Sequence, residues 1–235
     1  MLRPHDKYSL AGSFLLMNEP TLFITDNTAP IAPPLVPEIK LHLATEVVPL
    51  WRKTEEELEA IGVPPPYWAF AWAGGQALAR FILDRPAFVW DRSVLDFGAG
   101  SGIVGLAAAH AGARDVLCAD IDPFALAAIR LNASLNNLEL RTTAVDVLGQ
   151  VSPFELILVG DMCYERPLTD RLLAWLYAQL RAGAEVLLGD PGRSYFPKQN
   201  VEKLASYQVK TTRELEDREI RDTGVYRLLA GPGPI

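Results

Sequence analysis

Short apolar runs alternate with longer, helix-patterned segments over the larger, C-terminal part of the chain. The runs are rich in Val, Leu and Ile, which is typical of buried strands. One of the segments between them begins at Pro123 and repeats apolar side chains at Phe124, Ala127, Leu131 and Leu135, the spacing of one helix face. The alternation predicts strands over 93–97, 115–120, 139–146, 154–161 and 184–190, and helices over 103–111, 123–137 and 166–180.

Strands that alternate with single helices form parallel sheets covered by helices on both faces. The last two apolar stretches, 207–214 and 224–231, differ because only the charged segment 215–223 joins them, without a complete helix. Such a pair predicts an antiparallel hairpin at one end of the sheet. We therefore expect an α/β protein with a mostly parallel, doubly wound, Rossmann-like sheet that ends in an antiparallel C-terminal hairpin strand.

The N-terminal part follows a different pattern. Five prolines between Pro20 and Pro37 argue against a stable helix, so an irregular arm is expected there. The pattern becomes helical from Glu38 to Gly62 and again from Gly75 to Leu83. The predicted organisation is an arm over 1–37 and a single domain over 38–235, divided into N-terminal helices over 38–90 and a core over 91–235.

Composition narrows the class of protein. The chain is 49% apolar and 22% charged, as in globular proteins, and no apolar run approaches the ~18 residues of a membrane span. A net charge of −7 without a long basic run argues against a nucleic-acid partner. The three histidines are scattered and do not predict a metal site. The two cysteines are expected to be buried thiols in a reducing cytoplasm.

A glycine-rich turn follows the first predicted strand of the core. Asp96 ends that strand, Gly98, Gly100 and Gly102 follow at alternate positions, and a helix begins directly afterwards. Free N–H groups at a helix N-terminus and glycines that allow close approach predict a ligand site. A P-loop is excluded because no Gly-Lys-Ser/Thr follows, and a dinucleotide fingerprint fits only if Asp96 is ignored. S-adenosylmethionine is the third candidate.

Acidic residues end four successive predicted strands: Asp96, Asp120, Asp146 and Asp161. Ligands of doubly wound sheets bind at these carboxyl ends. For S-adenosylmethionine, Asp96 suits the ammonium group and Asp120 the ribose hydroxyls. Asp146 is placed either to bind the adenine amino group or to lie in an exposed turn. Asp122 precedes a helical proline and is expected to be a helix N-cap.

Four motifs together resemble a known family. VLDFGAGSG, ADIDP, GDMCYE and GDPGR are similar to the seven-β-strand methyltransferases, in particular to the protein-lysine methyltransferases with an Asp-x-x-Tyr motif after the fourth strand. The aromatic segment PPPYWAFAWAGGQALARFIL, with GDMCYE, is similar to the electron transfer flavoprotein β-subunit lysine methyltransferases. The resemblance extends from about Pro33 to the C-terminus.

The resemblance implies a seven-stranded class I methyltransferase fold and assigns residues to a site. Trp72, Ile121, Gly98 and Gly100 would bind S-adenosylmethionine, and Gly160 would edge the site of methyl transfer. The expected reaction is methylation of lysine in a protein substrate, the electron transfer flavoprotein β subunit.

Asp161 and Tyr164 are the predicted catalytic residues. Asp161 would capture and orient the lysine ammonium group, and Tyr164 would form a wall of its channel. No metal, membrane or nucleic-acid partner is expected. Two alternatives remain open at this point: methylation of a small amine or a nicotinamide-like molecule, and a non-catalytic cofactor-binding protein.

Overall fold

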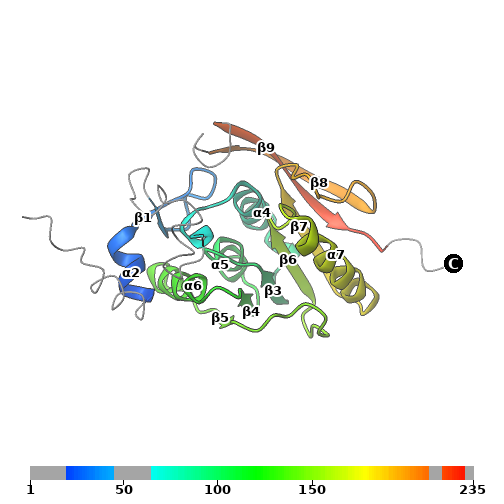
Figure 1. Cartoon of the computed structure of the whole chain (residues 1–235), viewed down its shortest axis with the longest axis horizontal. Coiled ribbons are helices and arrows are strands. Elements are labelled where there is room, and N and C mark those ends of the chain that lie inside the picture. Colours follow the sequence, from blue (N-terminus) through cyan, green and yellow to red (C-terminus); the bar gives the residue numbers. More distant parts are fainter. Residues whose placement is uncertain (1–19, 45–64, 212–218, 231–235) are drawn as a thin grey trace, which may run out of the picture.

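The central element is a sheet of seven strands in the order β5-β4-β3-β6-β7-β9-β8 (Figure 1). The computed structural model describes residues 20–44, 65–211 and 219–230. All strand pairs are parallel except those of β9, which runs antiparallel to both β7 and β8. The strands are β3 (Ser93–Phe97), β4 (Asp115–Ala119), β5 (Arg141–Thr143), β6 (Leu156–Gly160), β7 (Glu185–Asp190), β8 (Val201–Lys210) and β9 (Ile220–Leu228).

Helices cover both faces of the sheet because successive strand residues point to opposite sides. Val94 and Leu156 pack in the core cluster that includes α4, α5 and α6, whereas Leu95 and Ile157 pack in the cluster that includes α7. The predicted doubly wound α/β fold with a reversed C-terminal strand is therefore confirmed. The helices are α4 (Ala73–Asp84), α5 (Ile103–His110), α6 (Pro123–Leu135) and α7 (Arg166–Arg181).

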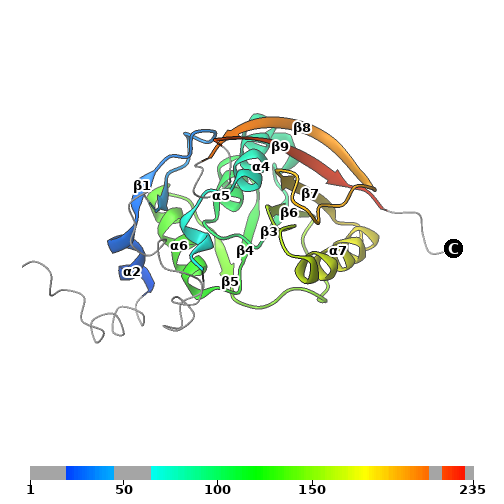
Figure 2. The ribbon, with the colours of Figure 1, turned by 45° about the horizontal axis from the view of Figure 1, so that its top comes forward.

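The strand order reverses between β3 and β6. From β3 the chain proceeds through β4 to the edge strand β5, and from β6 it proceeds through β7 in the opposite direction. In Figure 2, β8 and β9 arch over α4 at one end of the sheet. Loops that leave the carboxyl ends of β3 and β6 diverge at such a reversal, and this divergence leaves room for a ligand.

The N-terminal expectations were partly wrong. Within the expected irregular arm, Pro20–Asn27 form helix α2 and Ala29–Ile31 form β1, which pairs with β2 (Leu41–Leu43) where a helix from Glu38 was expected. Pro20 lies in the first turn of α2, where proline is tolerated because the N–H groups there have no partner within the helix. The remainder of the expected helix, 45–62, lies outside the described residues.

Strand boundaries differ most from the predictions at β5, β8 and β9, and β9 covers Ile220–Leu228 where a strand over 224–231 was expected. The expected strand over 139–146 is reduced to the three residues of β5. Strand β8 begins at Val201, six residues before the predicted start at Tyr207. A shift in register between Lys203 and Ala205 interrupts the inward–outward alternation of β8, so the pattern there did not resemble a strand.

Helix α4 crosses β7 at a contact between two glycines. A Cβ atom at Gly74 would lie 2.3 Å from the carbonyl oxygen of Gly189, and one at Gly189 would lie 2.1 Å from the carbonyl oxygen of Gly74. Real Cβ atoms do not approach backbone atoms this closely, so the crossing requires glycine on both elements. This contact sets the position of the N-terminus of α4 relative to the carboxyl ends of the strands.

We predict that Gly74→Ala lowers the free energy of unfolding by about 1–3 kcal/mol, because the added methyl group meets rigid backbone. The neighbouring Gly75→Ala is the matched control: its Cβ would meet two side-chain methyl groups, Cγ2 of Ile103 at 3.2 Å and Cγ2 of Val104 at 3.9 Å. Alanine favours a helix by up to about 1 kcal/mol over glycine, and this gain offsets the cost of the close contact. Gly75→Ala should therefore change the free energy of unfolding little. Urea unfolding measures both, and an equal loss in the two variants would contradict the crossing as the cause.

Candidate active site

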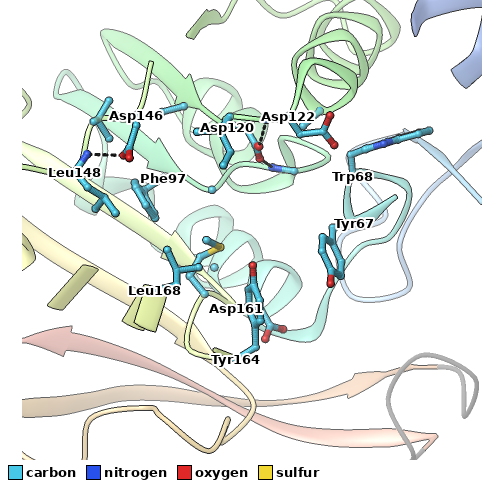
Figure 3. A pocket seen from close by; sticks show the side chains of 18 of the residues that line it. Tyr67, Trp68, Phe97, Asp120, Asp122, Asp146, Leu148, Asp161, Tyr164 and Leu168 are labelled. Carbon is cyan, nitrogen blue, oxygen red and sulfur yellow. Dashed lines mark hydrogen bonds between the residues drawn. The ribbon is translucent and has the colours of Figure 1, made fainter. Parts of the chain in front are cut away.

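A cavity of ≈ 460 Å³ opens at the carboxyl ends of β3, β4 and β6, where the strand order reverses. This volume is within the range of cofactor sites. In Figure 3, Asp120 and Asp122 lie on one side of it and Asp161 and Tyr164 on the opposite side. All predicted site residues except Asp96 line it: Trp72, Gly98, Gly100, Asp120, Ile121, Asp146, Gly160, Asp161 and Tyr164.

The glycine turn has the conformation that its sequence predicted. Gly98, Gly100 and Gly102 all have positive φ angles of +63°, +52° and +79°. Only glycine adopts this region readily. A Cβ at Gly98 would lie 2.5 Å from the sulfur of Met162, which also lines the cavity, so a larger residue would collide there. The turn thereby presents backbone directly to the cavity.

Asp120 is held by two backbone N–H groups and lines the cavity. Its Oδ2 accepts a hydrogen bond from the amide of Gly100 at 2.8 Å, and its Oδ1 accepts one from the amide of Asp122 at 3.0 Å. Burial raises the pKa of the Asp120 carboxyl. Each carboxylate oxygen retains acceptor capacity, so Asp120 can also accept bonds from two ribose hydroxyls. Asp122 caps α6 through the amide of Phe124, as predicted.

Asp96 lies behind the cavity wall, which corrects its expected direct contact with a ligand. The side chain is 1% exposed, and its Oδ2 accepts a hydrogen bond from the amide of Gly105, the third residue of α5, at 2.8 Å. It therefore caps a helix from the neighbouring strand. Burial, with a smaller contribution from the charge of Asp120, raises the pKa of Asp96 to about 7.

Asp146 lines the cavity from a loop, three residues beyond the end of β5. Its Oδ1 accepts a hydrogen bond from the amide of Leu148 at 3.0 Å, and its Oδ2 pairs with Arg171 at 3.0 Å. The side chain is half exposed. Figure 3 shows it beside Leu148, with Phe97 nearby. Its proposed contact with an adenine amino group stays a prediction.

Asp161 is the most constrained residue of the site. Its φ angle is +63°, a left-handed conformation that is unusual for a residue other than glycine. Its Oδ2 accepts a hydrogen bond from the amide of Gly74 at 2.8 Å, and its Oδ1 accepts one from Nε of Arg193 at 2.6 Å. The N-cap residue of α4, Trp72, makes no side-chain cap bond, so the carboxylate of Asp161 serves as the cap of that helix.

Aromatic side chains form the wall beside Asp161. The ring of Tyr67 lies 6.0 Å from that of Tyr164 and 6.0 Å from that of Trp72, whose indole N–H donates to the carbonyl of Tyr67 at 2.9 Å. Burial is the main cause that raises the pKa of Tyr164 to about 12, so its hydroxyl stays protonated at neutral pH. The guanidinium of Arg193 lies 5.9 Å from the Trp72 ring centre.

The sequence did not identify Arg193, which lines the cavity, or Asp190, which holds the backbone of Arg193 from behind the lining. Arg193 was read only as part of the GDPGR motif, because nothing local signals its pairing with an acid on a different strand. Asp190 ends β7 just as the four predicted acids end their strands, so the same rule would have found it. Its Oδ1 accepts hydrogen bonds from the amides of Gly192 and Arg193, both at 2.7 Å, and burial raises its pKa to about 6.

Metal-ligand groups and membrane helices were also considered. Within residues 20–44, 65–211 and 219–230, no three His, Cys, Asp or Glu side chains are grouped to hold a metal ion. No helix in these same ranges is long and apolar enough to cross a membrane.

Comparisons with known proteins relate most of the chain to a family of lysine methyltransferases. The chain is 41% identical over 214 residues to the electron transfer flavoprotein beta subunit lysine methyltransferase of Xenopus laevis, covering 88% of this chain and 86% of that protein. It is 35% identical over 226 residues to the protein of the same name from Homo sapiens, covering 92% and 84%. The family model for ribosomal protein L11 methyltransferase (PrmA) matches residues 80–159.

A solved structure from Thermoplasma acidophilum has a similar fold, with a TM-score of 0.51 and 14% identity over 66% of this chain and 89% of that one.

The fold and the site define a class I methyltransferase. The cavity, with its glycine turn and Asp120, fits S-adenosylmethionine, the cofactor of this class. The chain belongs to the electron transfer flavoprotein beta subunit lysine methyltransferase family.

We predict that Asp96 makes stability fall as pH rises from 5 to 7. Its folded pKa of about 7 lies above the ordinary value of 3.8, so between these values the folded state binds more protons than the unfolded state. The slope for one such group is at most about 1.4 kcal/mol per pH unit. Asp96→Asn, which retains an acceptor for Gly105, should remove that part of the slope. Urea unfolding at several pH values tests this, and an unchanged slope in Asp96→Asn would refute it.

We also predict that Asp120→Ala weakens S-adenosylmethionine binding at least about tenfold, because two charge-assisted hydrogen bonds to ribose are lost. Asp115→Ala is the matched control, since Asp115 lies at the opposite end of the same strand and pairs with Arg141. Isothermal titration calorimetry gives both dissociation constants. Equal affinities of the two variants for S-adenosylmethionine would refute the assignment of Asp120 to the ribose hydroxyls.

Proposed function

We propose that the protein methylates lysine side chains of the electron transfer flavoprotein β subunit, with S-adenosylmethionine as methyl donor. The observation that carries this proposal is the junction of the cofactor cavity with the aromatic wall beside Asp161. Tyr67 and Tyr164 are each 44% exposed at this junction, so an unbranched side chain can enter from outside between apolar surfaces. The names of the relatives supply the identity of the substrate.

Residues on two sides of the cavity would hold the cofactor. The glycine turn and Asp120 suit the ribose, whereas apolar side chains near Asp146 suit a flat adenine ring. When bound, S-adenosylmethionine would supply a methyl group on a positively charged sulfur. The lysine nitrogen would form the new C–N bond while the C–S bond breaks, and the electron pair of the C–S bond would stay on the sulfur. Holding the nitrogen in line with that bond is the main contribution expected from the protein.

Asp161 would hold the lysine nitrogen by accepting a hydrogen bond from one of its N–H groups. Both of its carboxylate oxygens already have a partner, Gly74 on one and Arg193 on the other, but each oxygen retains a second lone pair. The carboxylate cannot turn, because these two bonds and the left-handed backbone fix it. Asp161 would therefore act as a rigid acceptor that positions the amine, and not as a mobile side chain that captures it.

The compartment can be proposed as well. We infer a reducing cytoplasm, because both cysteines of the chain, Cys118 and Cys163, are buried free thiols.

The test incubates the native protein with the purified electron transfer flavoprotein β subunit and labelled S-adenosylmethionine. Label on lysine, located by mass spectrometry, is the expected result. Label transferred only to added small amines would favour the small-molecule alternative, and no transfer at all, despite cofactor binding, would favour a binding protein.

We predict that Asp161→Asn lowers the rate of transfer about a hundredfold or more, because the amine loses its rigid anionic acceptor. The dissociation constant for S-adenosylmethionine should stay within about threefold of native, since asparagine can still accept from Gly74. Calorimetry checks affinity and labelled transfer checks rate. If affinity falls together with the rate, Asp161 belongs to the cofactor site.

A further inference from the structure

The ion pair between Asp161 and Arg193 solves a problem that the proposed chemistry raises. A lysine attacks only as the neutral amine, yet its ordinary pKa is ~10.4, so at pH 7 only about one lysine side chain in 2,500 is neutral. An unpaired carboxylate beside the ammonium group would raise that pKa further and oppose the reaction. The acceptor that holds the lysine would then also keep it protonated.

Arg193 is built into the site in a way that removes this conflict. Its Nε donates to Oδ1 of Asp161 at 2.6 Å, and the two side chains are 20% and 5% exposed, so solvent screens the pair only weakly. The backbone amide of Arg193 donates to Asp190, which fixes the start of its side chain. Its guanidinium also lies near the face of Trp72, inside the wall of the substrate channel.

We propose that Arg193 is a positioning residue that neutralises Asp161, so that Asp161 can hold the substrate lysine without stabilising its charged form. The inference rests on the proposed lysine methylation. The ammonium group releases its proton to water before transfer, and the neutral nitrogen then accepts the methyl group. With Arg193 in place the local charge of the pair is close to zero, and the positive charge of the cofactor sulfur also favours the neutral amine.

Several other titratable groups surround the pair. Asp190 has a pKa of about 6, well below the range in which a lysine titrates, so its protonation can be separated from that of the substrate. Among the described residues, Cys163 and Tyr164 after β6 interact with Asp161, Tyr226 in β9 interacts with Asp190, and Tyr67 in η1 (Tyr67–Ala69), Asp120 after β4 and Glu165 interact with Tyr164.

The experiment compares two substitutions of Arg193 by the pH dependence of kcat at saturating substrate and cofactor. Arg193→Gln keeps an N–H donor for Asp161 but removes the charge, so the pH midpoint at which the rate rises should move up by about one to two units. The rate at pH 7 should fall by about 10- to 100-fold and recover at high pH. Arg193→Lys keeps the charge, and its midpoint should match that of the native enzyme.

Arg166→Gln is the control for charge alone, because exposed Arg166 begins α7 and does not line the cavity; its midpoint should not move. The inference is overturned if Arg193→Gln leaves the midpoint in place, if Arg193→Lys moves it equally, or if the control moves it too. Loss of S-adenosylmethionine binding in Arg193→Gln, measured by calorimetry, would also overturn it. Failure of the native enzyme to methylate any lysine would instead refute the proposed function.

Discussion

The carboxylate of Asp161 is the interaction on which the arrangement of the site depends. It accepts a hydrogen bond from the first turn of α4 and another from Arg193, while its own backbone amide donates to the carbonyl of Gly189 at 2.8 Å. One residue thus joins β6, β7 and a helix that precedes the core. The left-handed backbone angle is the cost of placing a side chain, rather than a glycine, at that junction.

The same principle recurs along the whole carboxyl edge of the sheet. Asp96 caps α5, Asp120 holds the glycine turn, Asp122 caps α6 and Asp190 holds the turn before Arg193. Helix starts and tight turns expose unpaired N–H groups, and acids at strand ends are the nearest acceptors for them. The acidic character of this edge therefore has a structural origin, and only those carboxylates that also reach the cavity can act on a ligand.

This distinction explains what the sequence could and could not predict. Hydrophobic periodicity located the strands and helices of the core, since burial on two faces leaves a clear pattern. It failed at β8, where an irregular register breaks the pattern, and at α2, where the number of prolines was weighed without their positions. For the site, residue type and strand-end position led to Asp120 and Asp161, which both line the cavity, while their roles stay predictions. The same evidence could not show that Asp96 faces a helix instead of the cavity.

The residues of the site come from both parts of the chain, the N-terminal segment before β3 and the core. The core supplies the glycine turn and the strand-end acids, but Tyr67, Trp72 and Gly74 all come from the segment before β3. The glycine contact between α4 and β7 brings this segment against the end of β6. Because Gly74 both permits the contact and donates its amide to Asp161, the geometry of the proposed substrate acceptor is set by the packing of a helix. A change that shifts α4 also moves the Asp161 carboxylate relative to the cavity, so the packing of this helix and the geometry of the site cannot vary independently.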